Sequence, residues 1–69
     1  MNYDDLYYFQ QEHRLSDRAI QFMLDFLADN GIKLNMVKEI AYYPYTDQFK
    51  IYTRKRNLCI RKEWLRRIE

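Results

Sequence analysis

The stretch from Ser16 to Asn30 constrains the fold more than any other part of this chain. Apolar side chains recur through it at helical spacing, at positions 20, 23, 24 and 27. Ser16 is a good helix N-cap, and Gly31 can adopt the left-handed conformation that ends a helix. More apolar side chains at 19, 22 and 26 leave a narrow polar face, so this helix is either central in the fold or half of an oligomer contact. The pattern predicts a homodimer packed through Phe22 and Phe26.

The chain is long enough for one small domain, residues 1–69, and too short for a dinucleotide-binding enzyme. Its hydrophobic fraction of 48% supplies a core and excludes intrinsic disorder. The single cysteine cannot form an internal disulfide. No apolar run reaches the roughly 18 residues of a membrane span, and the acidic start does not resemble a signal peptide. We therefore expect a soluble, cytoplasmic protein without a membrane partner.

Residues 2–13 and 32–45 flank the central helix. Asn2 can cap a helix over 2–13, and Asp4 and Asp5 lie where the helix dipole favours anions. Residues 32–45 are ambiguous, because apolar side chains at 32, 34 and 36 alternate as in a strand, whereas Asn35 could cap a short helix that ends before Pro44. The short helix is the favoured interpretation.

The last third of the chain predicts a hairpin followed by a helix. Residues 49–54 alternate between apolar and polar side chains, and Leu58–Ile60 form a second short strand after the turn Arg54–Asn57. Trp64, Leu65 and Ile68 give the segment 61–69 one apolar edge. The sequence thus predicts an α+β fold: two N-terminal helices, a short third element, a basic, wing-like β-hairpin and a short C-terminal helix. The expected core is Ile20, Met23, Leu24, Leu27, Ile32, Ile40, Phe49, Ile51, Leu58, Ile60, Trp64 and Leu65.

Catalytic and metal chemistry find no support in the sequence. Zinc needs about four ligands, and the chain has one histidine and one cysteine, far apart. Ser16 is the single serine and serves as a cap, and one glycine cannot build a phosphate-binding loop. Cys59 lies between Leu58 and Ile60, so it faces away from the core if they face it. We expect a buried or half-buried, inert thiol and not a nucleophile. We expect no enzymatic activity, no metal and no cofactor.

The charge is divided along the chain. Residues 1–31 carry six acidic and two basic side chains, whereas residues 32–69 carry ten basic and four acidic ones. Such asymmetry indicates a polyanionic partner. The alternative is that the two halves attract each other within the fold or across a dimer.

Three consecutive cations at the hairpin tip predict a mobile positive protrusion that can neutralise phosphates and reach a minor groove. The closing helix follows directly, so its cations can lie close to the hairpin. Lys50 lies among Tyr42, Tyr43, Tyr45 and Tyr52, and these tyrosines can hydrogen-bond phosphates or stack on bases. The alternatives are a solvated turn and tyrosines that pack in the core. The candidate nucleic-acid-binding residues, for which duplex DNA is the favoured partner, are Lys50, Tyr52, Arg54, Lys55, Arg56, Arg61, Lys62, Arg66 and Arg67.

The segments 49–52 and 56–65 together resemble the wing and closing helix of small excisionase-like winged-helix proteins from phages and mobile elements. In both, a basic hairpin ends in an apolar strand, and a short helix with an aromatic or leucine anchor follows, here Trp64 and Leu65. The resemblance is confined to this C-terminal part of the chain. It implies a phage or mobile-element protein that binds DNA in transcription regulation or DNA architecture, without catalysis.

A second function class is a protein-interaction module. Such a small inhibitor or adaptor would bind a host protein through the acidic N-terminal half or the apolar face of the helix 16–29. A salt titration against duplex DNA separates the two classes, because phosphate binding weakens steeply as salt rises.

Overall fold

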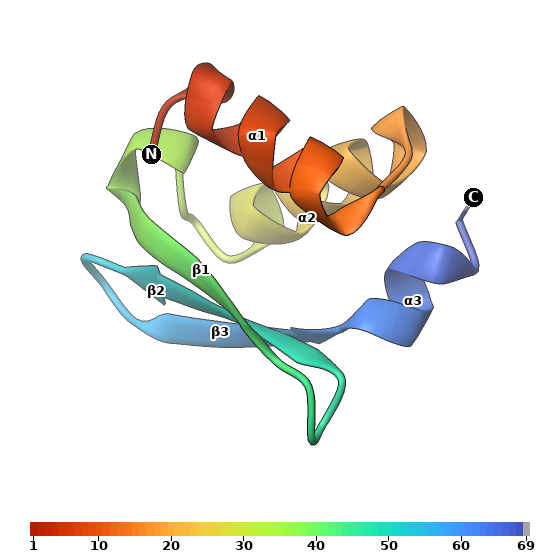
Figure 1. Ribbon diagram of the computed structural model, residues 1–69. Coiled ribbons are helices and arrows are strands. Elements are labelled where there is room, and N and C mark those ends of the chain that lie inside the picture. Colours follow the sequence, from red (N-terminus) through yellow and green to blue (C-terminus); the bar gives the residue numbers. More distant parts are fainter. Residues whose placement is uncertain (69) are drawn as a thin grey trace.

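The computed structural model describes residues 1–68. Two helices come first, α1 (Tyr3–His13) and α2 (Asp17–Asp29), followed by a single 3-10 turn, η1 (Leu34–Met36). Three strands follow, β1 (Val37–Tyr43), β2 (Gln48–Thr53) and β3 (Asn57–Arg61). The last strand leads directly into a short helix, α3 (Lys62–Arg66). Figure 1 shows α1 and α2 over one face of the sheet and α3 beyond the end of β3. The predicted α+β architecture is confirmed.

Both N-terminal helices begin at the polar caps that the sequence predicts. The amide of Asp5 donates to Asn2 Oδ1 at 2.9 Å, and the amide of Asn2 donates to the Asp5 carboxylate at 3.2 Å. This reciprocal pair is a capping box. At α2 the amide of Ala19 donates to Ser16 Oγ at 3.0 Å. These side chains fix where α1 and α2 start, because they satisfy amides that have no partner within the helix.

The end of α2 is also set locally. Gly31 has a φ of 71°, and its amide donates to the Ala28 carbonyl at 2.9 Å. The amide of Ile32 donates to the Leu27 carbonyl at 2.8 Å, which completes the Schellman motif expected from the glycine. α1 ends at Arg14, whose φ of 53° costs a residue with a Cβ roughly 1–2 kcal/mol.

The short helix favoured for residues 32–45 is wrong. Only η1 is helical there, and the segment from Val37 to Tyr43 is a strand that pairs antiparallel with β2. The register shifts between Val37 and Glu39, which marks a β-bulge. β-Branched and aromatic side chains favour this strand, and the ladder to β2 supplies backbone hydrogen bonds that local spacing does not reveal.

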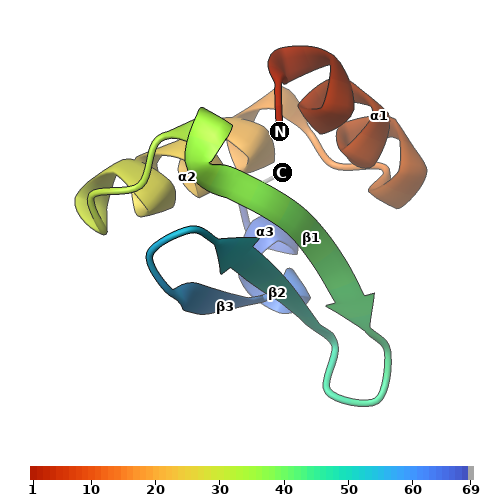
Figure 2. The same ribbon diagram turned by 90° about the vertical axis from the view of Figure 1, so that its left-hand side faces the viewer.

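β2 is the central strand of the sheet, which has the order β1-β2-β3 with antiparallel neighbours. Phe49, Ile51 and Thr53 are buried on its inner face, which α1 and α2 cover (Figures 1 and 2). Among residues 1–68, no helix lies over the opposite face (Figure 1). We call this opposite surface the outer face; by strand alternation and register it carries Glu39, Ala41, Tyr43, Gln48, Lys50, Tyr52, Asn57, Cys59 and Arg61.

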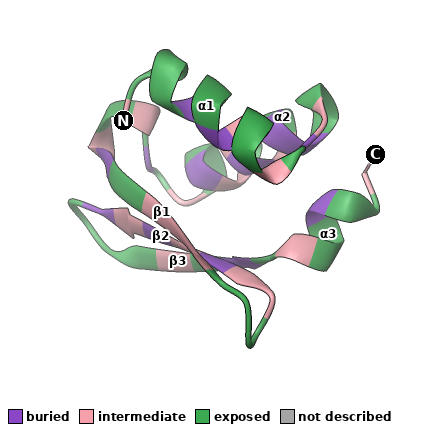
Figure 3. Cartoon of the chain, viewed as in Figure 1, coloured by how far each residue is buried: buried purple, intermediate pink, exposed green. Residues whose placement is uncertain are grey.

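The core fills the space between the inner face and the helices (Figure 3). Most of the expected core residues are buried, but Leu24, Ile40 and Leu58 are only half-buried, and Trp64 is 43% exposed. The buried stripe of α2 runs through Ala19, Ile20, Met23 and Leu27 instead. Apolar side chains cover most of the circumference of α2. The side of α2 that is buried is therefore set by where the sheet and α1 pack against it. Buried residues that the sequence reading missed are Leu6, Phe9, Leu15, Ala19 and Val37.

His13, at the end of α1, packs among aromatic rings. Its ring centroid lies 4.9 Å from that of Phe9, 5.0 Å from that of Phe49 and 5.6 Å from that of Tyr42. Burial lowers the pKa of His13; Glu12 opposes this shift and Lys62 adds to it. The imidazole therefore favours its neutral form in the folded protein.

No helix within residues 1–68 combines the length and the apolarity needed to cross a membrane.

Candidate nucleic-acid interface

The turn between β2 and β3 carries the three consecutive cations, and Thr53 orders it. Thr53 Oγ1 accepts from the amide of Lys55 at 3.2 Å and from the amide of Arg56 at 3.0 Å. The same hydroxyl donates to the carbonyl of Arg56. A buried threonine thus orders this turn through its hydroxyl, and it positions the backbone of the three cations.

Two of these cations contact the C-terminal end of α2. Arg56 Nη2 donates to the Asn30 carbonyl at 2.7 Å, and Lys55 Nζ donates to the Gly31 carbonyl at 3.4 Å. Carbonyls at a helix C-terminus lack partners within the helix and favour cations. The tip is therefore not the mobile protrusion that we expected, because it lies against α2. Arg54 is exposed at the start of the turn.

The cations in and beside the closing helix α3 differ in their contacts and in their exposure. Lys62 is half-buried, and its Nζ lies 4.8 Å from the ring centroid of Tyr42, a cation–π distance. Arg66 lies 3.8 Å from the Asp47 carboxylate, and Arg61 lies 3.7 Å from that of Glu63. Arg67 is exposed. Arg61, Arg66 and Arg67 are thus the exposed cations of this segment that can meet an outside anion, because exposed ion pairs like those of Arg61 and Arg66 are weak.

Asp47 joins the β1–β2 turn to the closing helix. Its carbonyl accepts from the amide of Lys62 at 3.0 Å, and its carboxylate accepts from the hydroxyl of Tyr42 at 2.6 Å. The hydrogen bond to Asp47 is the main reason that the pKa of Tyr42 is raised. Asp47 has a φ of 52°, so a strained turn residue holds this junction. The sequence reading did not single out Asp47; its place next to a Pro-containing turn was the available signal.

The hairpin tip and the closing helix lie at opposite ends of β3 (Figure 1). The closing helix adjoins the last strand of the hairpin, as expected, but its cations lie at the other end of that strand from Arg54, Lys55 and Arg56. They form two basic ends of the sheet, with the outer face between them.

The outer face presents a cluster built from Lys50, Tyr52 and Tyr43. The hydroxyls of Tyr43 and Tyr52 lie 2.7 Å apart in a hydrogen bond, and Lys50 Nζ lies 4.9 Å from the ring centroid of Tyr43. The hydrogen bond to Tyr43, followed by burial, raises the pKa of Tyr52. Cys59 is exposed on β3, directly opposite Lys50, so the expected burial of its thiol is wrong; β3 is an edge strand, and no helix within residues 1–68 covers the outer face on which Cys59 lies. The sequence named Tyr43 as one of four tyrosines near Lys50, and the strand over residues 37–43 shows that Tyr43 shares the outer face with Lys50 and Tyr52, whereas Tyr42 faces inward.

Phe22 and Phe26, the predicted dimer contact, are half-buried and pack against the core. The large aromatic side chains that are exposed lie elsewhere; they are Tyr3, Tyr7, Tyr8, Tyr43, Tyr45 and Trp64. The homodimer stays a prediction.

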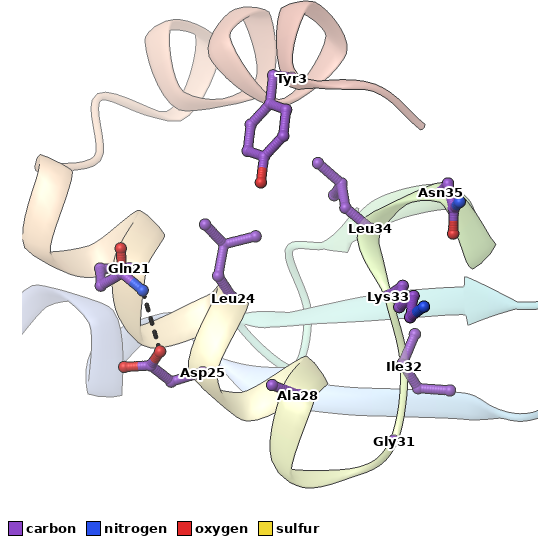
Figure 4. Close-up of a pocket in the computed structure, with 10 residues that line it drawn as sticks. All are labelled: Tyr3, Gln21, Leu24, Asp25, Ala28, Gly31, Ile32, Lys33, Leu34 and Asn35. Carbon is purple, nitrogen blue, oxygen red and sulfur yellow. Dashed lines mark hydrogen bonds between the residues drawn. The ribbon is translucent and has the colours of Figure 1, made fainter.

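An open groove of about 830 Å³ lies between the start of α1, one flank of α2 and the loop before β1 (Figure 4). Tyr3, Leu24 and Leu34 supply its apolar wall. Gln21 donates to Asp25 at 3.0 Å on its rim. This groove explains why Leu24 is only half-buried, and it is an apolar surface of the helical layer.

Within the described residues 1–68, no three His, Cys, Asp or Glu side chains gather to hold a metal ion. Comparison of the chain with protein-family models, with curated proteins and with solved structures gives no match.

Proposed function

We propose that this protein is a small nucleic-acid-binding regulatory protein, and that it meets the phosphates with the outer face and the two basic ends of its sheet. The observation that carries the proposal is the placement of charge. All six acidic residues of the N-terminal half belong to α1 and α2, on the inner side of the sheet. Lys50, Arg54 and Arg61 belong to the outer face or its ends. A polyanion that approaches the outer side therefore meets these cations, while the six N-terminal carboxylates lie behind the sheet; the outer face itself carries the carboxylate of Glu39.

The cations divide into two groups by their contacts. Arg56 and Lys62 hold the fold together, because one caps α2 and the other covers the Tyr42 ring. Arg54, Arg61 and Arg67 are exposed and project from the two basic ends. We assign the phosphate contacts to this second group, together with Lys50.

Duplex DNA remains the partner that the basic hairpin favours. A role in transcription regulation, a phage or mobile-element origin and an intracellular location belong to the same proposal. They rest on the resemblance of the segments 49–52 and 56–65 to excisionase-like proteins.

A salt titration of binding tests the proposal. Fluorescence anisotropy is measured with labelled duplex and single-stranded oligonucleotides over a range of salt concentrations, for the wild type, Arg54→Ala and Arg67→Ala. Each substitution should lower the slope of log K against log salt by about 0.9 on duplex or about 0.7 on a single strand, because one phosphate contact is lost. Both random and defined sequences should weaken by similar factors.

Arg18→Ala is the matched control, because Arg18 is an exposed cation of α2 on the helical side. It should leave the slope unchanged. Arg56→Ala is unsuitable as a probe, since it also removes the bond to Asn30. Wild-type protein that retains no nucleic acid at low salt would refute the proposed function.

The second candidate function is a protein-interaction module that binds a host protein. The groove beside Leu24 favours it, because half-buried apolar side chains there face an open cavity. Leu34→Asp would place a charge in the groove wall without touching the outer face. If the second candidate is right, this change abolishes the interaction and wild-type protein shows no salt-dependent binding of nucleic acid.

A further inference from the structure

Tyr43 and Tyr52 form an aromatic floor on the outer face. Tyr52 pairs with Glu39, which lies four residues from Tyr43 along β1, so the two tyrosine backbones are about 14 Å apart. Their hydroxyls nevertheless meet at 2.7 Å. Both side chains must therefore lean toward each other along the sheet. The ring of Tyr43 offers its face on this side, because the ammonium of Lys50 lies over it.

The floor combines ring faces with a movable cation. Lys50 Nζ lies 4.9 Å from the Tyr43 ring centroid, and Tyr43 is 39% exposed. The negative face of a ring attracts a cation, and it also accepts a stacked base. A base that takes this ring face displaces the ammonium of Lys50, which then lies free to pair with the neighbouring phosphate. Arg54 and Arg61, at the two ends of the sheet, can meet the phosphates on either side.

We propose that the outer face binds an unpaired segment of nucleic acid, with bases stacked on Tyr43 and Tyr52 and the phosphates held by Lys50 and the basic ends. This inference deepens the proposed function and rests on it. A single strand is the occupant that fits, because its bases have free faces, whereas duplex bases are stacked on one another. Charge complementarity selects nucleic acid over an uncharged aromatic ligand.

Cys59 supplies a reporter at the centre of this face. It is exposed, it lies opposite Lys50 in the register, and it is the single cysteine of the chain. Its rate of alkylation by a maleimide is measured alone, with an oligo-dT strand and with a duplex, each nucleic acid at saturation. The single strand should slow alkylation at least about tenfold, whereas the duplex, which rests on the basic ends, should slow it much less. A relocated thiol, Cys59→Ser with Gln11→Cys on the exposed side of α1, should react equally fast in all three samples.

Substitution of the two tyrosines of the aromatic floor tests the inference independently, through the affinity for oligo-dT. Tyr43→Leu and Tyr52→Leu should each lose about 5- to 140-fold in affinity for oligo-dT, the range that corresponds to about 1–3 kcal/mol of stacking per base. Tyr43→Phe keeps the ring and should bind within a few-fold of wild type. Tyr45→Leu removes a fully exposed tyrosine in the β1–β2 turn and should bind like wild type. Circular dichroism confirms that each variant is folded.

The outcomes separate this inference from the proposed function. Protection of Cys59 by the single strand, with loss of affinity in the leucine variants, supports both. If either nucleic acid binds without protecting Cys59, or if the leucine variants bind like wild type, bases do not stack on the aromatic floor and this inference is overturned. The proposed phosphate contacts would be unaffected by that result. No binding of either nucleic acid overturns both. Alkylation that slows as protein concentration rises, in the absence of nucleic acid, would show that a second copy occupies the face and would also overturn the inference.

Discussion

Replacing Leu27 or Leu24 of α2 by alanine should have clearly different effects, although the two residues lie three positions apart. Leu27 is 2% exposed, and its carbonyl accepts the amide of Ile32 where the helix ends. Leu24 is half-buried on the wall of the open groove, next to Tyr3 and Leu34 (Figure 4). The same chemical change therefore leaves a closed cavity at one position and a slightly wider groove at the other.

The magnitudes follow from burial. Leu→Ala at a fully buried site costs about 3–5 kcal/mol, because the lost transfer free energy and the cavity add together. At Leu24 water fills the space that opens, and part of the side chain is already exposed, so the cost should be about 1–2 kcal/mol. A chain of this length has a total stability of about 3–10 kcal/mol, so Leu27→Ala removes between about a third and all of it.

Urea denaturation followed by far-ultraviolet circular dichroism measures both costs. Because Leu27→Ala can unfold the chain outright, Leu27→Met serves as a second variant; it keeps the volume and should cost less than about 1.5 kcal/mol. A Leu24→Ala variant that is destabilised as much as Leu27→Ala would refute this account of how α2 faces the core.

The remaining predictions concern His13, two left-handed residues and the dimer. Burial lowers the pKa of His13, so as the pH falls below 6.5 the imidazole is protonated in the unfolded chain before it is protonated in the folded protein. The free energy of unfolding should therefore fall between pH 6.5 and the lower pKa of the folded state. His13→Gln should remove this dependence in urea melts at several pH values, and an unchanged profile would contradict it. Arg14→Gly should stabilise by about 1 kcal/mol and Gly31→Ala should destabilise by about the same, since both positions have a positive φ; melts showing the opposite signs would exclude this reasoning. Sedimentation at high micromolar concentration should show a homodimer that Phe22→Ser with Phe26→Ser dissociates, and a wild-type monomer would count against the dimer.

The helices could be predicted from sequence because their limits are set by neighbouring residues. The Asn2–Asp5 capping box, the Ser16 cap and the Gly31 turn each act within a few positions of the residues they satisfy. Local spacing carries that information.

β1 could not be predicted because its stabilisation is not local. The ladder to β2 joins Val37 to Thr53, and nothing near Val37 in the sequence marks that pairing. The same limit applies to the site. Counting identifies the cations, but only the fold shows that Arg56 reaches Asn30, 26 residues away, and that Lys62 lies over Tyr42.

Mapping of amide chemical shifts in the ¹⁵N-labelled protein, during titration with a short oligonucleotide at low salt, tests the central claim most directly. If the outer face is the nucleic-acid interface, the largest changes should fall on Lys50, Tyr52, Cys59 and the exposed Arg54, with smaller ones in α1 and on the helical side of α2. Changes confined to the helices and the groove around Leu24, or no change at any amide, would contradict it.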